Sequence, residues 1–156
     1  MNLRLAVLIA AATLSSTASA QTEEQQVRAT ASAIVSAYGS HDTGRYFALF
    51  APEATFVFHS SPTRLNSLAE YRKEWAKWEK EAGFRVRSCE SSNQMVQLFG
   101  EIAVFSHDVR TELTTNDGES TMHERETIIF HKRDGKWVAV HEHLSPQPEP
   151  HDNTGP

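Results

Sequence analysis

Cysteine and positive charge are scarce in this sequence, and it contains no apolar run long enough to span a membrane. Cys89 is the single cysteine among 156 residues, so no internal disulfide can form, and it is interpreted as a small buried hydrophobe or a free thiol. The sequence also has no glycine-rich phosphate loop, no Gly-x-Ser-x-Gly motif and no paired cysteine motif for a metal. Three familiar kinds of functional motif are therefore excluded.

The N-terminal segment predicts export. Arg4 gives a short positive start, residues 5–14 form an apolar run, and Ala18-Ser19-Ala20 supplies the small residues of a cleavage site. The apolar run has about half of the roughly 20 residues that a membrane-spanning helix needs. No cysteine follows the site to carry a lipid anchor. We expect a signal peptide over residues 1–20 and a periplasmic or secreted mature protein that does not associate with a membrane.

The expected mature chain is acidic and has the size of one domain. Removing Arg4 leaves 14 basic and 20 acidic side chains, a net charge of −6, which argues against nucleic acid as a partner. Residues 21–145 are enough for one domain with one core. Residues 146–156 are polar and rich in proline, so we expect a disordered tail there.

Apolar periodicity and capping residues predict helices in the first half of the chain. Helices are expected over residues 22–39, 42–50 and 67–83, and each begins at a Thr, Asp or Ser that can cap it. Gly39 and Gly83 are expected to end the first and third helices in a left-handed conformation.

The second half of the chain is rich in strand signals. A short β-rich run at residues 54–59 precedes the third helix, and residues 84–99 read as one bent strand broken at 91–93. Residues 100–145 contain three long strand-like runs, separated by turn signals at 116–118 and 134–135. Helices followed by a meander predict an α+β fold, with a pocket between three helices and a strongly bent antiparallel sheet.

Four segments resemble the SnoaL-like, nuclear transport factor 2-like superfamily. Residues 47–55, FALFAPEAT, are generic to it, whereas RET at 125–127, RDGKW at 133–137 and HEHLS at 141–145 are more specific. Across residues 100–145 the chain looks most like the association domain of calcium/calmodulin-dependent kinase II and its stand-alone bacterial relatives. The resemblance implies a cone-shaped sheet wrapped around three helices, with a pocket at the open end and pairing into dimers or larger rings.

Arg110 and Arg125 match two strand arginines of the association-domain pattern, and the resemblance implies a pocket role for both. Two guanidinium groups converging on a cavity would bind a carboxylate, because each matches it bidentately. The alternative is that each arginine pairs with a neighbouring acid, such as Glu112 or Glu124, as surface ion pairs ordinarily do. A small organic acid is therefore the expected ligand.

Three histidines are candidates for acid–base chemistry or ligand binding. His141 and His143 lie two residues apart, so they are expected on one sheet face together with Trp137. They could orient a carboxylate or transfer a proton near neutral pH. His59 ends the short strand from which ketosteroid isomerase relatives take their proton-abstracting aspartate, and it could substitute as a base. A third metal ligand cannot be placed beside His141 and His143, so neither a metal nor another cofactor is expected.

Tyr71 and Trp75 belong to the apolar stripe of the third helix, and we expect them to form both core and pocket wall. The superfamily includes isomerases, dehydratases, cyclases and non-catalytic assembly modules, so the fold does not define the function. The first hypothesis is a binding domain for a small carboxylate-bearing molecule, and a homodimer or larger assembly is expected. An isomerase-, dehydratase- or cyclase-type enzyme with a histidine acid/base, and a homo-oligomeric assembly module, remain open.

Overall fold

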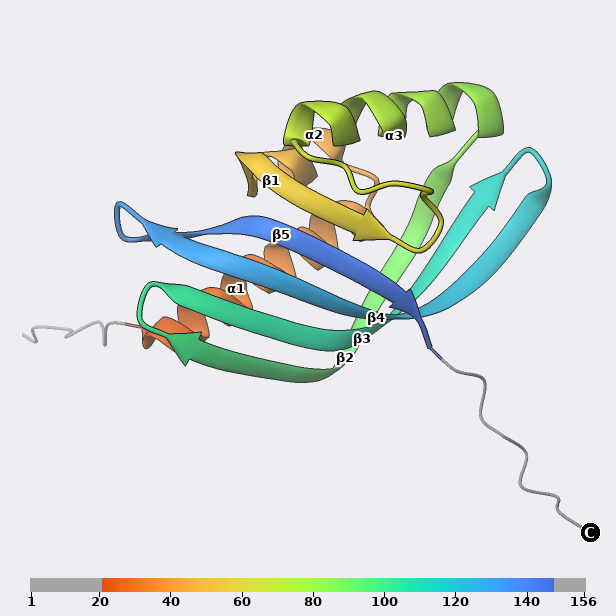
Figure 1. Cartoon of the computed structure of the whole chain (residues 1–156). Helices are drawn as coiled ribbons and strands as arrows, with labels where there is room; N and C mark the ends of the chain where they lie inside the picture. The colour runs from red at the N-terminus through yellow and green to blue at the C-terminus, as the bar shows by residue number, and fades with distance from the viewer. Residues whose placement is uncertain (1–20, 148–156) are drawn as a thin grey trace, which may run out of the picture.

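The computed structural model describes residues 21–147, so the expected signal peptide and residues 148–156 of the expected tail lie outside the described residues. The elements, in chain order, are α1 (Glu23–Gly39), α2 (Thr43–Phe47), β1 (Phe50–Phe58), α3 (Leu68–Ala82), β2 (Arg85–Phe99), β3 (Ile102–Thr115), β4 (Gly118–Arg133) and β5 (Lys136–Pro146). This order confirms the predicted α+β fold, with the helices toward the N-terminus and a four-strand meander at the end (Figure 1).

Local capping fixes where the helices begin. Thr22, Asp42 and Ser67 are the N-caps, and each side-chain oxygen accepts a hydrogen bond from the backbone N–H three residues later. Gly83 ends α3 with a φ of 63°, in the left-handed region where a glycine costs least. These sequence predictions are confirmed.

The predicted left-handed cap at Gly39 is wrong. α1 includes Gly39, its C-cap is Ser40 with a φ of −89°, and the left-handed residue is His41 with a φ of 55°. Gly39 instead allows β2 to approach closely, because a Cβ atom there would lie 2.8 Å from the backbone nitrogen of Cys89. The glycine therefore serves packing between α1 and β2.

The sheet has five strands in the order β1-β5-β4-β3-β2 and is mixed. β2 to β5 form the expected antiparallel meander, but β1 pairs with β5 in parallel, so the expectation of a wholly antiparallel sheet is corrected at this edge. α3 and the rest of the meander separate β1 from β5 in the chain, which permits a parallel pairing. Asp134 and Gly135, with φ values of 50° and 76°, form the predicted tight turn between β4 and β5.

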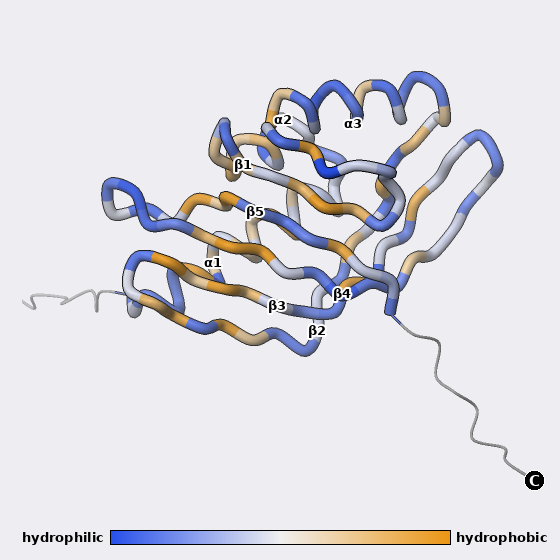
Figure 2. The backbone as a smooth tube through the Cα atoms, in the orientation of Figure 1, coloured by the Kyte–Doolittle hydropathy of each residue, from blue (hydrophilic) through white to orange (hydrophobic). Residues whose placement is uncertain are grey.

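The inner face of the curved sheet packs against the helices and forms the core (Figures 1 and 2). Along β3, Ala103, Phe105, His107 and Val109 are buried, whereas the residues between them are only partly buried, as alternation on a strand requires. On α3 only the stripe of Leu68, Tyr71 and Trp75 is buried, and the rest of that helix is mainly hydrophilic (Figure 2). No helix within residues 21–147 is long and apolar enough to cross a membrane.

One irregularity in β5 changes which side chains face inward. Phe130 on β4 pairs with Ala139, but the preceding residue, Ile129, pairs with His141. Val140 is therefore an extra residue in β5. Such a bulge shifts the alternation by one position. After it, Glu142 and Leu144 share the inner face with Ala139.

The tip of the β3–β4 hairpin is fastened to the end of α3. The backbone N–H of Asn116 donates to the carbonyl of Ala82 at 2.7 Å, and its side-chain amide donates to the carbonyl of Glu81 at 3.0 Å. Figure 1 shows this hairpin curling upward toward α3. The sheet and α3 are thereby joined at one end of the space between them.

Candidate functional site

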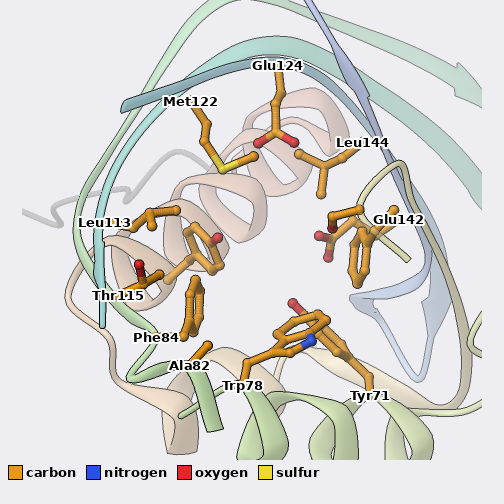
Figure 3. Close-up of a pocket in the computed structure, with 13 residues that line it drawn as sticks. Tyr71, Trp78, Ala82, Phe84, Leu113, Thr115, Met122, Glu124, Glu142 and Leu144 are labelled. Atoms are coloured by element: carbon orange, nitrogen blue, oxygen red, sulfur yellow. The ribbon is translucent and has the colours of Figure 1, made fainter. Parts of the chain in front are cut away.

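A cavity of about 290 Å³ lies between α3 and the inner face of the curled sheet (Figure 3). Its walls are mainly apolar and aromatic, and the carboxyl groups of Glu124 and Glu142 point into it (Figure 3). Within residues 21–147, no lysine, arginine or histidine lines it; the lining residues are Tyr38, Phe58, Ser60, Tyr71, Trp78, Ala82, Phe84, Leu113, Thr115, Met122, Glu124, Glu142 and Leu144.

A smaller space of about 20 Å³ adjoins the cavity on its inner side. The two spaces share Tyr38, Glu124, Glu142 and Leu144, and the smaller one also reaches Glu126 and Cys89. Three glutamate side chains on β4 and β5 therefore meet at the floor of the cavity. Each of the three residues is less than one-tenth exposed.

Glu142 is the most deeply placed of the cavity carboxyl groups, and it is 2% exposed. The hydroxyl group of Tyr46 donates to its Oε2 at 3.0 Å, and the hydroxyl of Tyr71 lies 3.3 Å from that of Tyr46. Burial, followed by the charge of Glu126, raises the pKa of Glu142 well above its ordinary value. Glu142 therefore holds a proton at a pH where an exposed glutamate is ionised.

Glu126 connects Glu142 to a buried histidine. Glu126 and Glu142 share a side-chain hydrogen bond, and Oε2 of Glu126 lies 2.5 Å from Nε2 of His107. Nδ1 of His107 in turn lies 2.7 Å from the hydroxyl oxygen of Ser91 on β2. Burial raises the pKa of Glu126 to about 7 and lowers that of His107 to about 4. The buried pair is therefore uncharged and shares one proton between those pH values.

His59 is the single histidine of the three acid–base candidates that reaches the edge of the cavity. Its Nε2 lies 2.6 Å from Oε1 of Glu124, and its chain neighbours Phe58 and Ser60 line the cavity. The contact leaves the second carboxyl oxygen of Glu124 available to a ligand. His59 is therefore connected to the cavity through its contact with Glu124.

His141 and His143 lie on the outer face of the sheet, contrary to the expectation that they share a face with Trp137. The extra residue Val140 reverses the alternation between Trp137, which is buried, and the two histidines. Nδ1 of His141 lies 2.8 Å from the hydroxyl oxygen of Thr55 on β1. Neither histidine lines the cavity.

Arg110 and Arg125 do not converge on the cavity. The inner face of β3 carries Val109 and that of β4 carries Glu124, so Arg110 and Arg125, each the next residue along its strand, face outward. Arg110 forms an ion pair with Glu112 at 2.7 Å, and both side chains are about two-fifths exposed, as the surface-pair alternative expects. The interpretation of a paired-arginine pocket for a carboxylate is therefore wrong.

Tyr71 lines the cavity as expected, but Trp75 does not. Trp75 is 2% exposed and packs among Tyr38, Tyr46 and Phe47 in the core, and its indole N–H donates to Glu79 at 2.8 Å. Trp78, one turn further along α3, takes the place in the cavity wall.

Cys89 is unsuited to nucleophilic chemistry. It is half-buried beside the smaller space, and burial raises the pKa of its thiol to about 12. The thiol therefore stays protonated near neutral pH.

Within residues 21–147, no group of three or more His, Cys, Asp or Glu side chains is arranged to hold a metal ion.

Sequence reasoning missed Glu124, Glu126 and Glu142, although a signal existed for two of them. Ile128 and Phe130 are apolar and alternate, and Glu124 and Glu126 continue the same phase along β4. Following that phase places both acids on the inner face. Glu142 could not be found in this way, because the bulge at Val140 interrupts the alternation in β5.

Comparison with known proteins supports the same family as the sequence motifs. Residues 27–149 match the family described as the SnoaL-like domain. No curated protein matches the chain significantly.

Several solved structures share the fold at low sequence identity. A protein from Xanthomonas campestris, proposed to be a calcium/calmodulin-dependent protein kinase II association domain, is 22% identical, with a TM-score of 0.68, over 83% of this chain and 91% of that one. A nuclear transport factor 2-like superfamily protein from Salmonella enterica is 16% identical, with a TM-score of 0.71, over 85% and 96%. A further such protein, from Cytophaga hutchinsonii, is 10% identical, with a TM-score of 0.70, over 81% and 100%.

Proposed function

The chain belongs to the SnoaL-like domain family, and on that premise we propose that it is a small-molecule-binding domain whose ligand occupies the cavity between α3 and the sheet. Domains of this fold are commonly ligand-binding or isomerase-type domains. The observation that carries the proposal is the cavity itself, whose apolar walls surround two buried carboxyl groups. Apolar walls with a few convergent polar groups are typical of ligand sites.

The cavity favours a compact and mainly apolar ligand. Its volume of about 290 Å³ is at the lower end of the range for small-molecule sites. The walls would bury the apolar part of such a ligand, and one polar group would reach Glu124 or Glu142. An organic anion is disfavoured, since the lining offers two carboxyl groups and no basic side chain.

The proposal is tested by narrowing the cavity from α3. Ala82 lines the cavity, whereas Ala76 is exposed on the same helix and does not line it. In a thermal-shift screen of small uncharged, cationic and anionic molecules, binding raises the unfolding temperature with ligand concentration. We expect Ala82→Leu to lose the response to the best compound and Ala76→Leu to keep it. Equal responses in the two variants would place binding elsewhere and reject the proposal.

A second candidate function, an isomerase-type enzyme, is favoured by the linked acid–base groups at the cavity floor. Tyr46, Glu142, Glu126 and His107 form a continuous series of hydrogen bonds. Such a series can deliver or accept a proton at Glu142 during catalysis. The test is deuterium incorporation at carbon when a bound compound is incubated with protein in D₂O. Incorporation by the parent and its loss in Glu142→Gln would support catalysis, and no incorporation for any bound compound would reject it.

We also propose that the protein forms a homodimer through the outer face of the sheet. Met95, Phe99 and Ile102 share that face at one end of β2 and β3, and their exposed fractions are 52%, 63% and 36%. Val104 and Ile129 continue this patch inward along the paired strands. A contiguous apolar patch on a soluble protein commonly marks an interaction surface.

A further inference from the structure

Aromatic rings form much of the cavity wall. Phe58, Tyr71, Trp78 and Phe84 follow one another, with ring centroids 5.0, 6.1 and 5.9 Å apart, and Tyr38 adds a fifth ring from α1. In Figure 3, Tyr71 and Trp78 project into the cavity from α3, at the bottom of the view, and Phe84 stands to one side. The face of an aromatic ring is electron-rich and attracts a cation within about 6 Å.

The polar part of the cavity is acidic. The carboxyl group of Glu124 enters it from β4, opposite Trp78, and that of Glu142 enters from β5 at one side (Figure 3). These residues are 8% and 2% exposed, so water screens them little. His59 contacts one oxygen of Glu124 but does not itself line the cavity. The space therefore combines electron-rich walls with two partly desolvated acids and no basic side chain.

Each class of ligand charge has a different consequence in this space. An anion would meet the carboxyl groups without a compensating donor from a basic side chain. A neutral apolar molecule would bury the carboxyl groups further without pairing them, which costs free energy. A compact cation would contact the rings and complement the acids. We infer that the cavity selects an alkylated ammonium ion, held against the aromatic rings and beside Glu124 and Glu142, an inference that rests on the proposed ligand-binding function.

The inference also predicts that Glu142 releases a proton when the cation binds. Burial and the charge of Glu126 raise the pKa of Glu142, so without a ligand this group keeps its proton at a pH where an exposed glutamate is ionised. A bound cation favours the ionised carboxylate, and the O–H proton passes to solvent. The titratable groups around Glu142 are Tyr38 from α1, Tyr46 from α2, His59 after β1, Tyr71 from α3, Cys89 from β2, Glu124 and Glu126 from β4 and, behind Glu126, His107 from β3.

The test compares three probes of one shape and different charge by calorimetric titration of the mature protein. Choline carries a trimethylammonium group, 3,3-dimethylbutan-1-ol replaces its nitrogen by carbon, and 3,3-dimethylbutanoate adds a negative charge. We expect choline to bind at least about tenfold more tightly than the alcohol, because each ring contact and the carboxylates favour the charge. No binding is expected for the anion. As the pH rises above about 4.5, the ordinary pKa of a glutamate, the affinity for choline should rise, by up to about tenfold per pH unit for one proton released.

Two variants separate the contributions of the rings and the acid. Trp78→Leu keeps an apolar wall, and Glu142→Gln keeps the shape and a hydrogen-bonding group for Tyr46. We expect both to lower the affinity for choline about tenfold or more and to leave that for the alcohol within about threefold. Glu112→Gln, on the outer face, is the control and should bind as the parent does. Proton release, measured from the heat of binding in two buffers of different ionisation enthalpy, should disappear in Glu142→Gln.

The outcomes distinguish this inference from the function on which it rests. Equal binding of choline and the alcohol, blocked by Ala82→Leu, would keep the binding function and overturn the selection of a cation. Tighter binding of the anion would overturn it as well. If none of the three probes binds, the inference is overturned. The proposed function is then decided by the wider thermal-shift screen alone. Tighter choline binding without proton release would overturn the role of Glu142.

Discussion

At the scale of single residues, Glu126 and His107 bring ionisable groups into a part of the protein that water hardly reaches. Burial moves their pKa values in opposite directions, to about 7 for Glu126 and to about 4 for His107. The native state therefore binds the Glu126 proton more tightly than the unfolded state, and this group lowers stability as pH rises from about 4.5 to 7. The lowered pKa of His107 has the opposite effect: stability increases as the pH rises from about 4 to 6.5. The two contributions oppose each other over most of that range.

Replacing Glu126 removes one side of this balance. For Glu126→Gln we expect the free energy of unfolding, relative to the parent, to rise with pH between about 4.5 and 7, by up to about 1.4 kcal/mol per pH unit. The measurement is urea unfolding at a series of pH values. Glu112→Gln is the control, because the Glu112 carboxyl is exposed and Arg110 lowers its pKa. Parallel pH profiles for the parent and Glu126→Gln would contradict the burial of an ionisable group at this position.

At the scale of elements, the features that local sequence determines were predictable. The caps at Thr22, Asp42 and Ser67 and the turn at Asp134 depend on a few neighbouring residues, so their signals can be read from the sequence. The bulge at Val140 depends on how β4 pairs with β5, which no local signal encodes. The inward position of Glu142 followed from that pairing, so the full acidic floor of the cavity could not be predicted.

The connection between α3 and the β3–β4 hairpin gives a prediction at the same scale. A Cβ atom on Gly83 would lie 2.4 Å from Oδ1 of Asn116, and Gly83 has a φ of 63°. Gly83→Ala should therefore cost about 1–2 kcal/mol for the backbone conformation, plus the cost of displacing Asn116. In an Asn116→Ala background the clash is absent, so the same substitution should cost less, by on the order of 1 kcal/mol. Urea unfolding of the four proteins measures the difference, and strictly additive costs would contradict the contact.

At the scale of the whole molecule, the apolar patch on the outer face is the basis for the proposed dimer. Light scattering behind a sizing column should give twice the monomer mass for the mature protein. Phe99→Lys combined with Ile102→Lys should give monomers, because two charges would be buried without partners in the interface. Ala76→Lys, on the exposed face of α3, should remain dimeric. A parent protein that is monomeric at micromolar concentration would reject the proposal.

Export is a second property of the whole molecule. We propose that the chain is exported, because it has an apolar run at residues 5–14 and a cleavage site at Ala18-Ser19-Ala20. Intact mass of the protein recovered from the cell envelope or the medium should correspond to a chain that begins at Gln21. A mass that includes residues 1–20 would reject cleavage at this site.

The extra residue in β5 also determines how this chain must be aligned with its relatives. A related protein whose fifth strand lacks the bulge reaches the same inward carboxyl position with one codon fewer, so the two genes correspond only if a gap stands opposite Val140 or His141. Without that gap, the residue matched to Glu142 would be an outward-facing one, and the residues matched to His141 and His143 would be cavity residues. For a relative without the bulge, a comparison of cavity chemistry therefore depends on a single insertion or deletion in the coding sequence.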